Sequence, residues 1–236
     1  MKVILMAAGI GSRISNKING PKCTLEVKTS NGTMPLVRYT VARLIEKGHD
    51  VAIVTGYMHE CIRDALDGLN VKFYHNPFFK VTNSIASLWF AADYLKDEDV
   101  LLMNADVYWT DEILESFEKS MDGFTMLADV TRVKDGDYFF GLAGDYIARY
   151  GKELLINERD TEYVGMAVIR KSKVDIFRER LIQMILDGKY DLWWENVLYE
   201  YLDVDPVRVV DVEGNFWAEV DYFEDYMRIL DFTKDM

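Results

Sequence analysis

The chain is short of positive charge, cysteine and long hydrophobic runs, and each shortage excludes a class of protein. Its 27 lysines and arginines face 40 acidic residues, and the formal charge of −13 would repel a nucleic-acid backbone. Cys23 and Cys61 are too few for a disulfide framework. The apolar run Val3 to Ala8 is too short for a signal peptide, and no run approaches the roughly 18 to 20 apolar residues that span a bilayer. These absences predict a cytoplasmic protein that binds neither nucleic acid nor membrane.

Histidine is also scarce, and the chain has no internal repeat, low-complexity tract or linker. His49, His59 and His75 lack the mutual spacing of metal ligands. Half of the residues are hydrophobic and 28% are charged, which is typical of a folded protein. Because 236 residues lie near the upper limit of what one core organises, we expect a single domain over residues 1–236.

Short apolar and β-branched runs bounded by turn residues predict five buried strands. They are Val3–Met6, Val51–Thr55, Val71–Tyr74, Val100–Asn104 and Phe124–Ala128. Segments with helical spacing lie between them, at Leu36–Glu46, Glu60–Leu66, Ser84–Tyr94 and Glu112–Lys119. This alternation predicts an α/β fold: a Rossmann-like, mostly parallel mixed sheet with helices on both faces.

The pattern changes after about Asp129. Between Tyr138 and Ile169, glycines separate short alternating runs, which predicts a small antiparallel extension in the C-terminal half. Further periodicity predicts helices at Val174–Leu186, Leu192–Tyr201 and Tyr222–Phe232, with a strand at Val207–Val212.

The first predicted strand leads into a loop of small residues suited to binding phosphate. Backbone N–H groups at such a strand end can approach a phosphate chain, and Arg13 and Lys22 would neutralise it. The loop lacks the GK[ST] of a Walker P-loop, and Ile14 stands where a GxGxxG motif has its third glycine. From spacing alone, an ordinary glycine turn with two solvated cations remains an alternative.

Two aspartates distant in sequence are candidate metal ligands. Asp106 follows the apolar run Val100 to Met103, so its carboxylate should project from the carboxyl end of a strand, where open α/β sheets bind ligands. Asp221 lies at a predicted strand-to-helix junction. A turn residue and a helix N-cap are the alternative roles. Carboxylate oxygens are ligands that Mg²⁺ prefers.

Two motifs resemble those of a known family. LMAAGIGSR followed by GPKCTLEV resembles the paired signature of the sugar-nucleotidyltransferase-like superfamily, whose members transfer a nucleotidyl group to a phosphate. The resemblance implies that Lys22 contacts phosphate during transfer, and that the nucleotide is held by Ala7, Ala8, Gly9, Gly11, Ser12 and Arg13. It also implies that Asp106, in an NAD motif, and Asp221, in an ExD motif with Glu219, hold Mg²⁺.

The remaining segments resemble bacterial CTP:phosphocholine cytidylyltransferases most closely. TNSIASLW resembles the family segment that faces the base, which implies that the nucleotide is also contacted by Asn83, Ser84 and Ser87. The C-terminal tail from Tyr190 resembles the family's acceptor end, and the likeness is weakest between Thr131 and Thr161. The resemblance implies a nucleotide-binding part at about 1–129 and an acceptor-binding part at about 130–236.

Aromatic and acidic residues gather in the segments assigned to the acceptor. A quaternary ammonium donates no hydrogen bond, so aromatic faces and a nearby carboxylate recognise it. The candidates for this role are Tyr138, Trp194, Glu195, Trp217 and Glu219. Adjacent helical residues do not share a face, so one of Trp193 and Trp194 is expected to pack in the core instead. Tyr138 stands where the phosphocholine enzymes carry tryptophan. An acceptor with a primary ammonium in place of the trimethylammonium group therefore remains an alternative.

The expected reaction is Mg²⁺-dependent transfer of CMP from CTP to a small phosphorylated amino alcohol, with release of pyrophosphate. Lys22, Arg13, Asp106 and Asp221 are the expected catalytic residues, in a monomer or homodimer. The alternatives are the same chemistry on an aminoalkylphosphonate or a sugar 1-phosphate, and a non-catalytic nucleotide-binding protein. A molybdenum-cofactor-type guanylyltransferase shares the N-terminal signature, but the C-terminal tail disfavours it.

Overall fold

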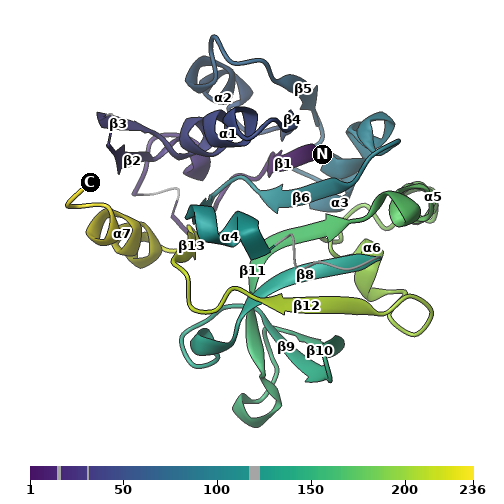
Figure 1. Ribbon diagram of the computed structural model, residues 1–236. Coiled ribbons are helices and arrows are strands. Elements are labelled where there is room, and N and C mark those ends of the chain that lie inside the picture. The colour runs from purple at the N-terminus through teal and green to yellow at the C-terminus, as the bar shows by residue number, and fades with distance from the viewer. Residues whose placement is uncertain (15–16, 31, 117–122) are drawn as a thin grey trace.

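The computed structural model describes residues 1–236 apart from 15–16, 31 and 117–122, and a nine-stranded sheet forms its centre (Figure 1). The strand order is β5-β4-β1-β6-β11-β8-β12-β10-β9. In chain order these strands are β1 Lys2–Ala7, β4 Asp50–Thr55, β5 Lys72–His75, β6 Val100–Asn104, β8 Phe124–Asp129, β9 Phe139–Ala143, β10 Tyr146–Gly151, β11 Thr161–Ile169 and β12 Val207–Asp211.

The sheet combines a parallel block with an antiparallel extension. β1 runs parallel to β4 and β6, so Val3 lies opposite both Val51 and Leu101. β11 then pairs antiparallel with both β6 and β8, β12 returns parallel to β8, and the β9–β10 hairpin closes the edge. The predicted α/β class, with a mixed sheet and an antiparallel extension in the C-terminal half, is confirmed.

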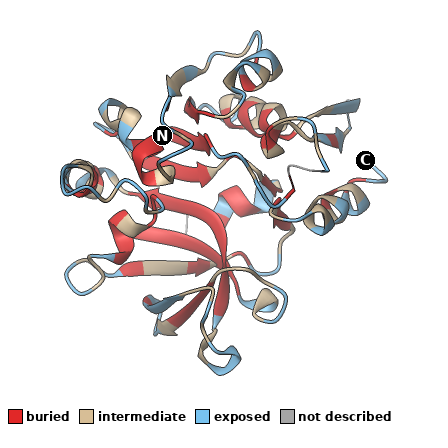
Figure 2. Cartoon of the chain, turned by 180° about the vertical axis from the view of Figure 1, so that it is seen from behind, coloured by how far each residue is buried: buried red, intermediate tan, exposed pale blue. Residues whose placement is uncertain are grey.

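Helices cover both faces of the sheet because the strands are apolar on both faces. Val3 and Leu5 belong to one core cluster, and Ile4 and Met6 to the other, as the period of two along a strand requires. The first cluster packs under α1 (Leu36–Glu46), α2 (His59–Ala65) and α4 (Asp111–Glu115), and the second under α3 (Ser84–Phe90), α5 (Lys171–Leu186) and α6 (Asn196–Tyr199). Figure 2 shows the central strands buried between these layers, whereas strands such as β5 and β10 are partly exposed.

Two short ribbons and a terminal helix complete the described part of the chain. β2 (Glu26–Thr29) pairs with β3 (Gly32–Pro35), and β7 (Val107–Trp109) pairs with β13 (Trp217–Glu219). A third core cluster joins both ribbons to α7 (Phe223–Phe232), through residues that include Val27, Tyr108 and Ile229. This cluster fastens the C-terminal segment beside the carboxyl ends of β1 and β6.

One predicted helix is shorter than expected. Leu192–Tyr201 is α-helical only from Asn196 to Tyr199. The reason is that the preceding residues bond elsewhere: the backbone N–H of Ile85 donates to the carbonyl of Leu192, and the backbone N–H of Trp194 donates to Ser84 Oγ. Helical spacing in the sequence cannot reveal such competing partners.

The other predicted elements lie close to their expected bounds. Helix Leu36–Glu46 has its predicted limits, and Ser84–Tyr94 divides into α3 and a 3₁₀ turn at Ala92–Tyr94. The prediction Glu112–Lys119 corresponds to α4, and its last residues lie outside the described ones. Over the described residues, every helix is too short or too polar to cross a membrane.

Candidate active site

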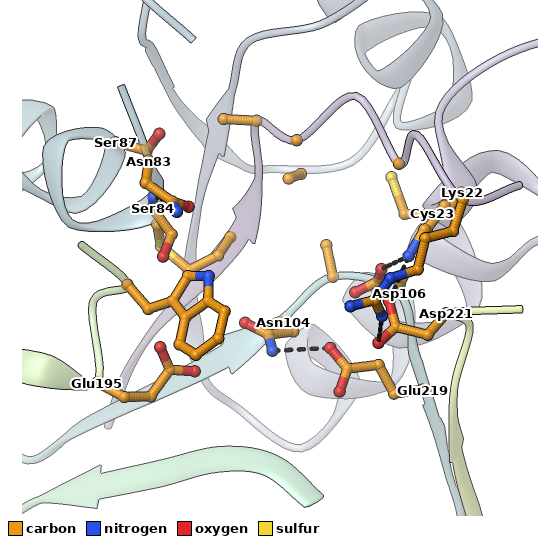
Figure 3. A pocket seen from close by; sticks show the side chains of 18 of the residues that line it. Lys22, Cys23, Asn83, Ser84, Ser87, Asn104, Asp106, Glu195, Glu219 and Asp221 are labelled. Atoms are coloured by element: carbon orange, nitrogen blue, oxygen red, sulfur yellow. Dashed lines mark hydrogen bonds and ion pairs between the residues drawn. The ribbon is translucent and has the colours of Figure 1, made fainter. Parts of the chain in front are cut away.

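A cavity of about 440 Å³ opens at the carboxyl ends of β1 and β6 (Figure 3). This is the edge at which open α/β sheets bind ligands. Fifteen of the residues named from the sequence line it, namely Ala7, Ala8, Gly9, Gly11, Ser12, Arg13, Lys22, Asn83, Ser84, Ser87, Asp106, Tyr138, Glu195, Glu219 and Asp221. Residues from both halves of the chain therefore meet in one space.

The loop after β1 packs closely on Lys22. Gly11 has φ +66°, a conformation that favours glycine, and a Cβ there would lie 2.9 Å from the Lys22 side chain. Gly9 has open space around its Cα. The two glycines therefore have different roles. Gly11 leaves room for the Lys22 side chain, and Gly9 leaves its backbone open to the cavity.

The β7–β13 ribbon brings the two candidate metal ligands together. Asp106 precedes β7 and Asp221 follows β13. In the antiparallel register Glu219 lies opposite Val107, and the Val220 backbone N–H donates to the Asp106 carbonyl at 3.0 Å. Two aspartates more than a hundred residues apart are therefore held at one point by main-chain hydrogen bonds.

Lys22 lies between these carboxylates. Its Nζ is 2.7 Å from Asp221 Oδ1 and 3.6 Å from Asp106 Oδ2. Burial alone would lower the pKa of Lys22, but Asp106 and Asp221 outweigh it and the pKa is raised. Burial raises the pKa of Asp106, whereas Lys22 and Arg13 hold the pKa of Asp221 below its usual value against the effect of burial. Lys22 is charged at neutral pH, and it favours the ionised form of both aspartates.

Glu219 adds a third carboxyl group beside this pair. Burial first, and then Asp106 and Asp221, raise the pKa of Glu219 well above its ordinary value. Asn104 Nδ2 donates to Glu219 Oε1 at 2.9 Å, and Asn104 Oδ1 accepts from Trp194 Nε1 at 3.2 Å. Three carboxyl groups are crowded at this point, and the raised pKa values of Asp106 and Glu219 reflect burial and mutual repulsion, which a cation in addition to Lys22 would relieve.

The donor set fits a magnesium ion that substrate would help to hold. Within residues 1–14, 17–30, 32–116 and 123–236, no group of three or more acidic, histidine or cysteine side chains has metal-binding geometry. Mg²⁺ is commonly held by one or two carboxylates together with substrate phosphates and water. Asp106 and Asp221 supply two such carboxylates.

A second ionic cluster joins the two halves of the cavity. Arg13 Nη1 donates to Asp221 Oδ2 at 2.7 Å and to Asp137 Oδ2 at 3.3 Å. Lys152 Nζ also donates to Asp137 Oδ2. Arg13 comes from the loop after β1, and Lys152 follows β10 in the antiparallel extension. One carboxylate therefore links cations from the two ends of the site.

Across the cavity from Lys22 and Asp221, the residues assigned to the base also form local hydrogen bonds (Figure 3). Asn83 caps α3 by accepting the Ser84 N–H at 2.8 Å. Ser87 is buried, and its Oγ accepts from Asn76 Nδ2 at 2.9 Å. These bonds hold the N-terminus of α3 against the cavity.

A group of aromatic rings surrounds Glu195 at the acceptor end. The ring centroid of Tyr138 lies 5.7 Å from that of Trp193 and 6.1 Å from that of Tyr199. Glu195 is buried beside the Tyr163 side chain. Burial raises the pKa of Glu195 to about 7. This end of the cavity combines ring faces with one titratable carboxyl.

Two of the predicted acceptor residues do not line the cavity. Trp194 is fully buried among the residues under α5, and Trp217 is 4% exposed and donates from Nε1 to Asp129 Oδ2 at 2.9 Å. The neighbouring Trp193, which is 42% exposed, lines the cavity instead of Trp194. The alternation of neighbouring side chains explains this correction, because Trp194 fills the core.

Sequence reasoning missed several lining residues. They include Asn104, Asp137, Lys152 and Tyr163. Asn104 belongs to the NAD motif that already signalled Asp106, so a signal existed for it. Asp137 and Lys152 lie in the stretch where the family likeness is weakest, and no motif marked them.

Comparison with known proteins identifies the family of the chain. Residues 3–160 match the MobA-like NTP transferase domain. The whole chain is 24% identical to 99% of the choline-phosphate cytidylyltransferase of Streptococcus pneumoniae. Over 121 residues, 49% of this chain, it is 32% identical to the bifunctional protein GlmU of Francisella tularensis, of which it covers 24%.

Solved structures share the fold. The CTP:phosphocholine cytidylyltransferase of Streptococcus pneumoniae superposes with a TM-score of 0.76 at 20% identity, over 98% of each chain. The inositol-1-phosphate CTP transferase of T. maritima gives 0.75 at 18% identity, over 99% of this chain and 96% of the other. The family match over residues 3–160 and these similarities together show that the chain belongs to the MobA-like NTP transferase domain family and is a nucleotidyltransferase.

Proposed function

We propose that the protein is a cytidylyltransferase that transfers CMP from CTP to a small phosphorylated amino alcohol of the phosphocholine type. The observation that carries the proposal is the acceptor end of the cavity, where Glu195 lies among Tyr138, Tyr163, Trp193 and Tyr199. Ring faces and a carboxylate together select a cationic group. Similarity to choline-phosphate cytidylyltransferase over the whole chain supports this acceptor. The two free cysteines fit a cytoplasmic setting.

The chemistry needs no general base. An oxygen of the acceptor phosphate, already ionised near neutral pH, forms a bond to the α-phosphorus of CTP, and the bond from that phosphorus to the bridging oxygen breaks to release pyrophosphate. Lys22 and Arg13 would offset negative charge on the phosphates. Mg²⁺ held by Asp106 and Asp221 would supply further charge neutralisation. What these residues contribute is positioning and electrostatics.

A sugar 1-phosphate is the main competing acceptor, since similar folds include a putative glucose-1-phosphate thymidylyltransferase. A sugar requires several hydrogen-bonding side chains around its hydroxyls, whereas rings and a single buried carboxyl dominate this end of the cavity. An aminoalkylphosphonate would present the same ammonium group and an equivalent anion, so the proposal includes it as an alternative substrate.

A substrate panel tests the proposal directly. We expect the highest kcat/KM with CTP and a cationic acceptor when pyrophosphate release is measured for four nucleoside triphosphates crossed with phosphocholine, phosphoethanolamine, 2-aminoethylphosphonate and glucose 1-phosphate. A site that forms hydrogen bonds with the correct base discriminates against a triphosphate with a wrong base by far more than about tenfold in kcat/KM. Equal kcat/KM for CTP and GTP would contradict the cytidylyl assignment, and a preference for the sugar phosphate would contradict the cationic acceptor.

Glu195→Gln should raise KM for the cationic acceptor by about tenfold, equivalent to about 1.4 kcal/mol, and leave KM for CTP unchanged. The reason is that glutamine keeps the shape of the side chain and removes the charge facing the cation. Glu200→Gln is the matched control, because Glu200 is close in sequence and pairs with Lys189 at the surface. An unchanged acceptor KM would mean that Glu195 has only a structural role.

The pH dependence of the acceptor KM provides an independent measurement. Because the pKa of Glu195 is raised to about 7, its carboxyl is largely neutral below that pH and charged above it. Acceptor KM should therefore fall as pH rises from 6 to 8. Ionisation of the acceptor phosphate, near pH 6, affects both enzymes. The change in acceptor KM centred near pH 7 should be missing in Glu195→Gln. The same pH dependence of acceptor KM in the wild type and in Glu195→Gln would contradict the assignment of Glu195 to the acceptor.

A further inference from the structure

Asn104 lines the cavity but has no part in the chemistry described so far. It is the last residue of β6, and its side-chain amide is hydrogen-bonded at both of its polar atoms. Nδ2 donates to Glu219 Oε1 at 2.9 Å, and Oδ1 accepts from Trp194 Nε1 at 3.2 Å. One amide therefore joins a core tryptophan to a carboxyl group of the cavity.

Trp194 determines which way the Asn104 amide faces. An indole N–H can only donate a hydrogen bond, so the Asn104 atom that meets Trp194 must be the oxygen. The NH₂ group of the amide is then directed to Glu219, whose carboxyl oxygen accepts. Trp194 is itself held in place, because it is fully buried and its backbone N–H donates to Ser84 Oγ at 2.9 Å. The tryptophan thus selects one of two orientations of the amide.

The sheet leaves space for the hydrogen bond between Asn104 and Glu219. The register of β11 against β8 shifts between Tyr163 and Ala167, and Gly165 between them has φ +83°. A Cβ at Gly165 would lie 3.3 Å from Asn104 Nδ2 and 3.6 Å from Glu219 Oε2. Glycine suits this position, because other residues rarely adopt that conformation and a Cβ would crowd the amide.

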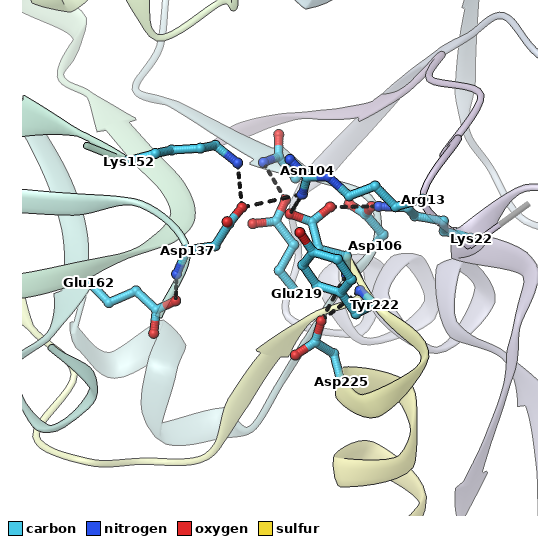
Figure 4. Close-up of polar contacts among 11 residues, drawn as sticks. Arg13, Lys22, Asn104, Asp106, Asp137, Lys152, Glu162, Glu219, Tyr222 and Asp225 are labelled. Atoms are coloured by element: carbon cyan, nitrogen blue, oxygen red, sulfur yellow. Dashed lines mark hydrogen bonds and ion pairs between the residues drawn. The ribbon is translucent and has the colours of Figure 1, made fainter. Parts of the chain in front are cut away.

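Glu219 lies next to the ionic groups of the cavity. Figure 4 shows Asn104 and Glu219 close to Lys22 and Asp106. The charges of Asp106, Asp221 and Lys22 all act on the Glu219 carboxyl. In the proposed mechanism the phosphates and Mg²⁺ bind at this place. The direction in which the Glu219 carboxyl points therefore affects the electrostatic environment of the reacting groups.

We propose that Asn104 is a positioning residue that holds the Glu219 carboxyl in one orientation beside Asp106 and Asp221, and that Trp194 sets the direction of the Asn104 amide. The core tryptophan thereby influences turnover without touching a substrate. This role does not depend on which acceptor reacts, so the inference goes beyond the proposed function. If the substrate panel selects a sugar 1-phosphate, the proposed function fails and the inference is still tested with that acceptor.

Asn104→Leu keeps the size of the side chain and removes both hydrogen bonds. We expect kcat to fall by about tenfold or more, because displacing a group by about 1 Å at a reacting centre can cost about 100-fold in rate. KM for CTP and for the acceptor should change by less than about threefold, since both polar atoms of the amide contact protein groups. In a Glu219→Ala background, Asn104→Leu should lower kcat by less than about twofold further, because its partner is already absent.

Trp194→Phe tests the other end of the chain of hydrogen bonds. It keeps an aromatic ring in the core and removes the indole N–H, so the amide is free to turn its oxygen to Glu219. We expect kcat to fall by about threefold or more. Trp217→Phe is the matched control, because Trp217 is also buried and its Nε1 donates to the buried Asp129. Thermal unfolding should show a similar loss of stability in both variants.

Nuclear magnetic resonance of the five tryptophan indole groups gives a measurement that is independent of turnover. The ¹H–¹⁵N signal that is missing in Trp194→Phe belongs to Trp194. That signal should shift in Asn104→Leu, because its acceptor is lost, and the Trp217 signal should not.

Three results would overturn the role of Asn104. They are an unshifted Trp194 signal in Asn104→Leu, a kcat within about twofold of the wild type, and the same loss of kcat with and without Glu219. Equal losses of kcat in Trp194→Phe and Trp217→Phe would overturn the role of Trp194. Asn104→Ala replaces Asn104→Leu if the leucine variant does not fold, since the smaller side chain fits the same space.

Discussion

Asp106→Asn should lower kcat by about 100-fold or more, a loss of at least about 2.7 kcal/mol of transition-state stabilisation. Asparagine keeps the size of the side chain but removes the negative charge of the carboxylate that we propose as a ligand of Mg²⁺. Asp221→Asn should have a similar effect, because Asp221 also accepts from Lys22 and Arg13. Initial rates at saturating CTP and acceptor, measured over a range of Mg²⁺ concentrations, give the effect on kcat.

The fold should survive the loss of Asp106. Burial raises the pKa of Asp106, so its ionised form is disfavoured there and a neutral amide relieves that cost. We expect the free energy of unfolding to change by less than about 1 kcal/mol. Asp111→Asn is the control, since Asp111 is 55% exposed and pairs with Lys47 and Arg43 outside the cavity.

Metal binding can be measured separately from turnover. Electron paramagnetic resonance of Mn²⁺ in the presence of CTP should show weaker binding to Asp106→Asn than to the wild type and to Asp111→Asn. Wild-type Mn²⁺ affinity together with a kcat above a tenth of the wild-type value would exclude Asp106 as a ligand.

Lys22→Met should lower kcat by about 100- to 1,000-fold, the usual cost of removing one group that stabilises transition-state charge. Lys22 is a cation that lines the cavity, with 11% of its side chain exposed, and its raised pKa keeps it charged. Without it, charge on the phosphates and on Asp221 is left uncompensated. KM for CTP should rise as well, because the same cation serves the ground state.

Lys17→Met provides the comparison, because Lys17 lies shortly before Lys22 in the sequence, with 51% of its side chain exposed. Thermal unfolding must accompany the kinetics. Breaking a fully buried ion pair destabilises by about 3–5 kcal/mol, and this partly exposed one should cost less. A folded Lys22→Met enzyme with kcat within threefold of the wild type would remove Lys22 from the mechanism.

Local sequence patterns were sufficient where the structure depends on neighbouring residues. Helix Leu36–Glu46 was predicted at its observed limits because its buried positions repeat at helical spacing. Segment Leu192–Tyr201 has comparable spacing, but hydrogen bonds from its first residues to Ser84 and Ile85 shorten the helix. The same partners fix which of two adjacent tryptophans faces the cavity. Those contacts join residues about a hundred positions apart in the sequence, and the hydrophobic periodicity of either segment does not predict them.

The sequence by itself determined which chemical groups end up at the carboxyl edge of the sheet. The apolar run before Asp106 makes a buried strand, and a residue just beyond such a strand must emerge at its end. Tertiary structure alone decided which of these groups meet. The β7–β13 pairing places Asp221 beside Asp106, and the packing of the 130–137 loop on Glu162 places Asp137 between Arg13 and Lys152. Such partnerships depend on closing long loops and on one particular strand register, and neither is set by residues that are neighbours in the chain.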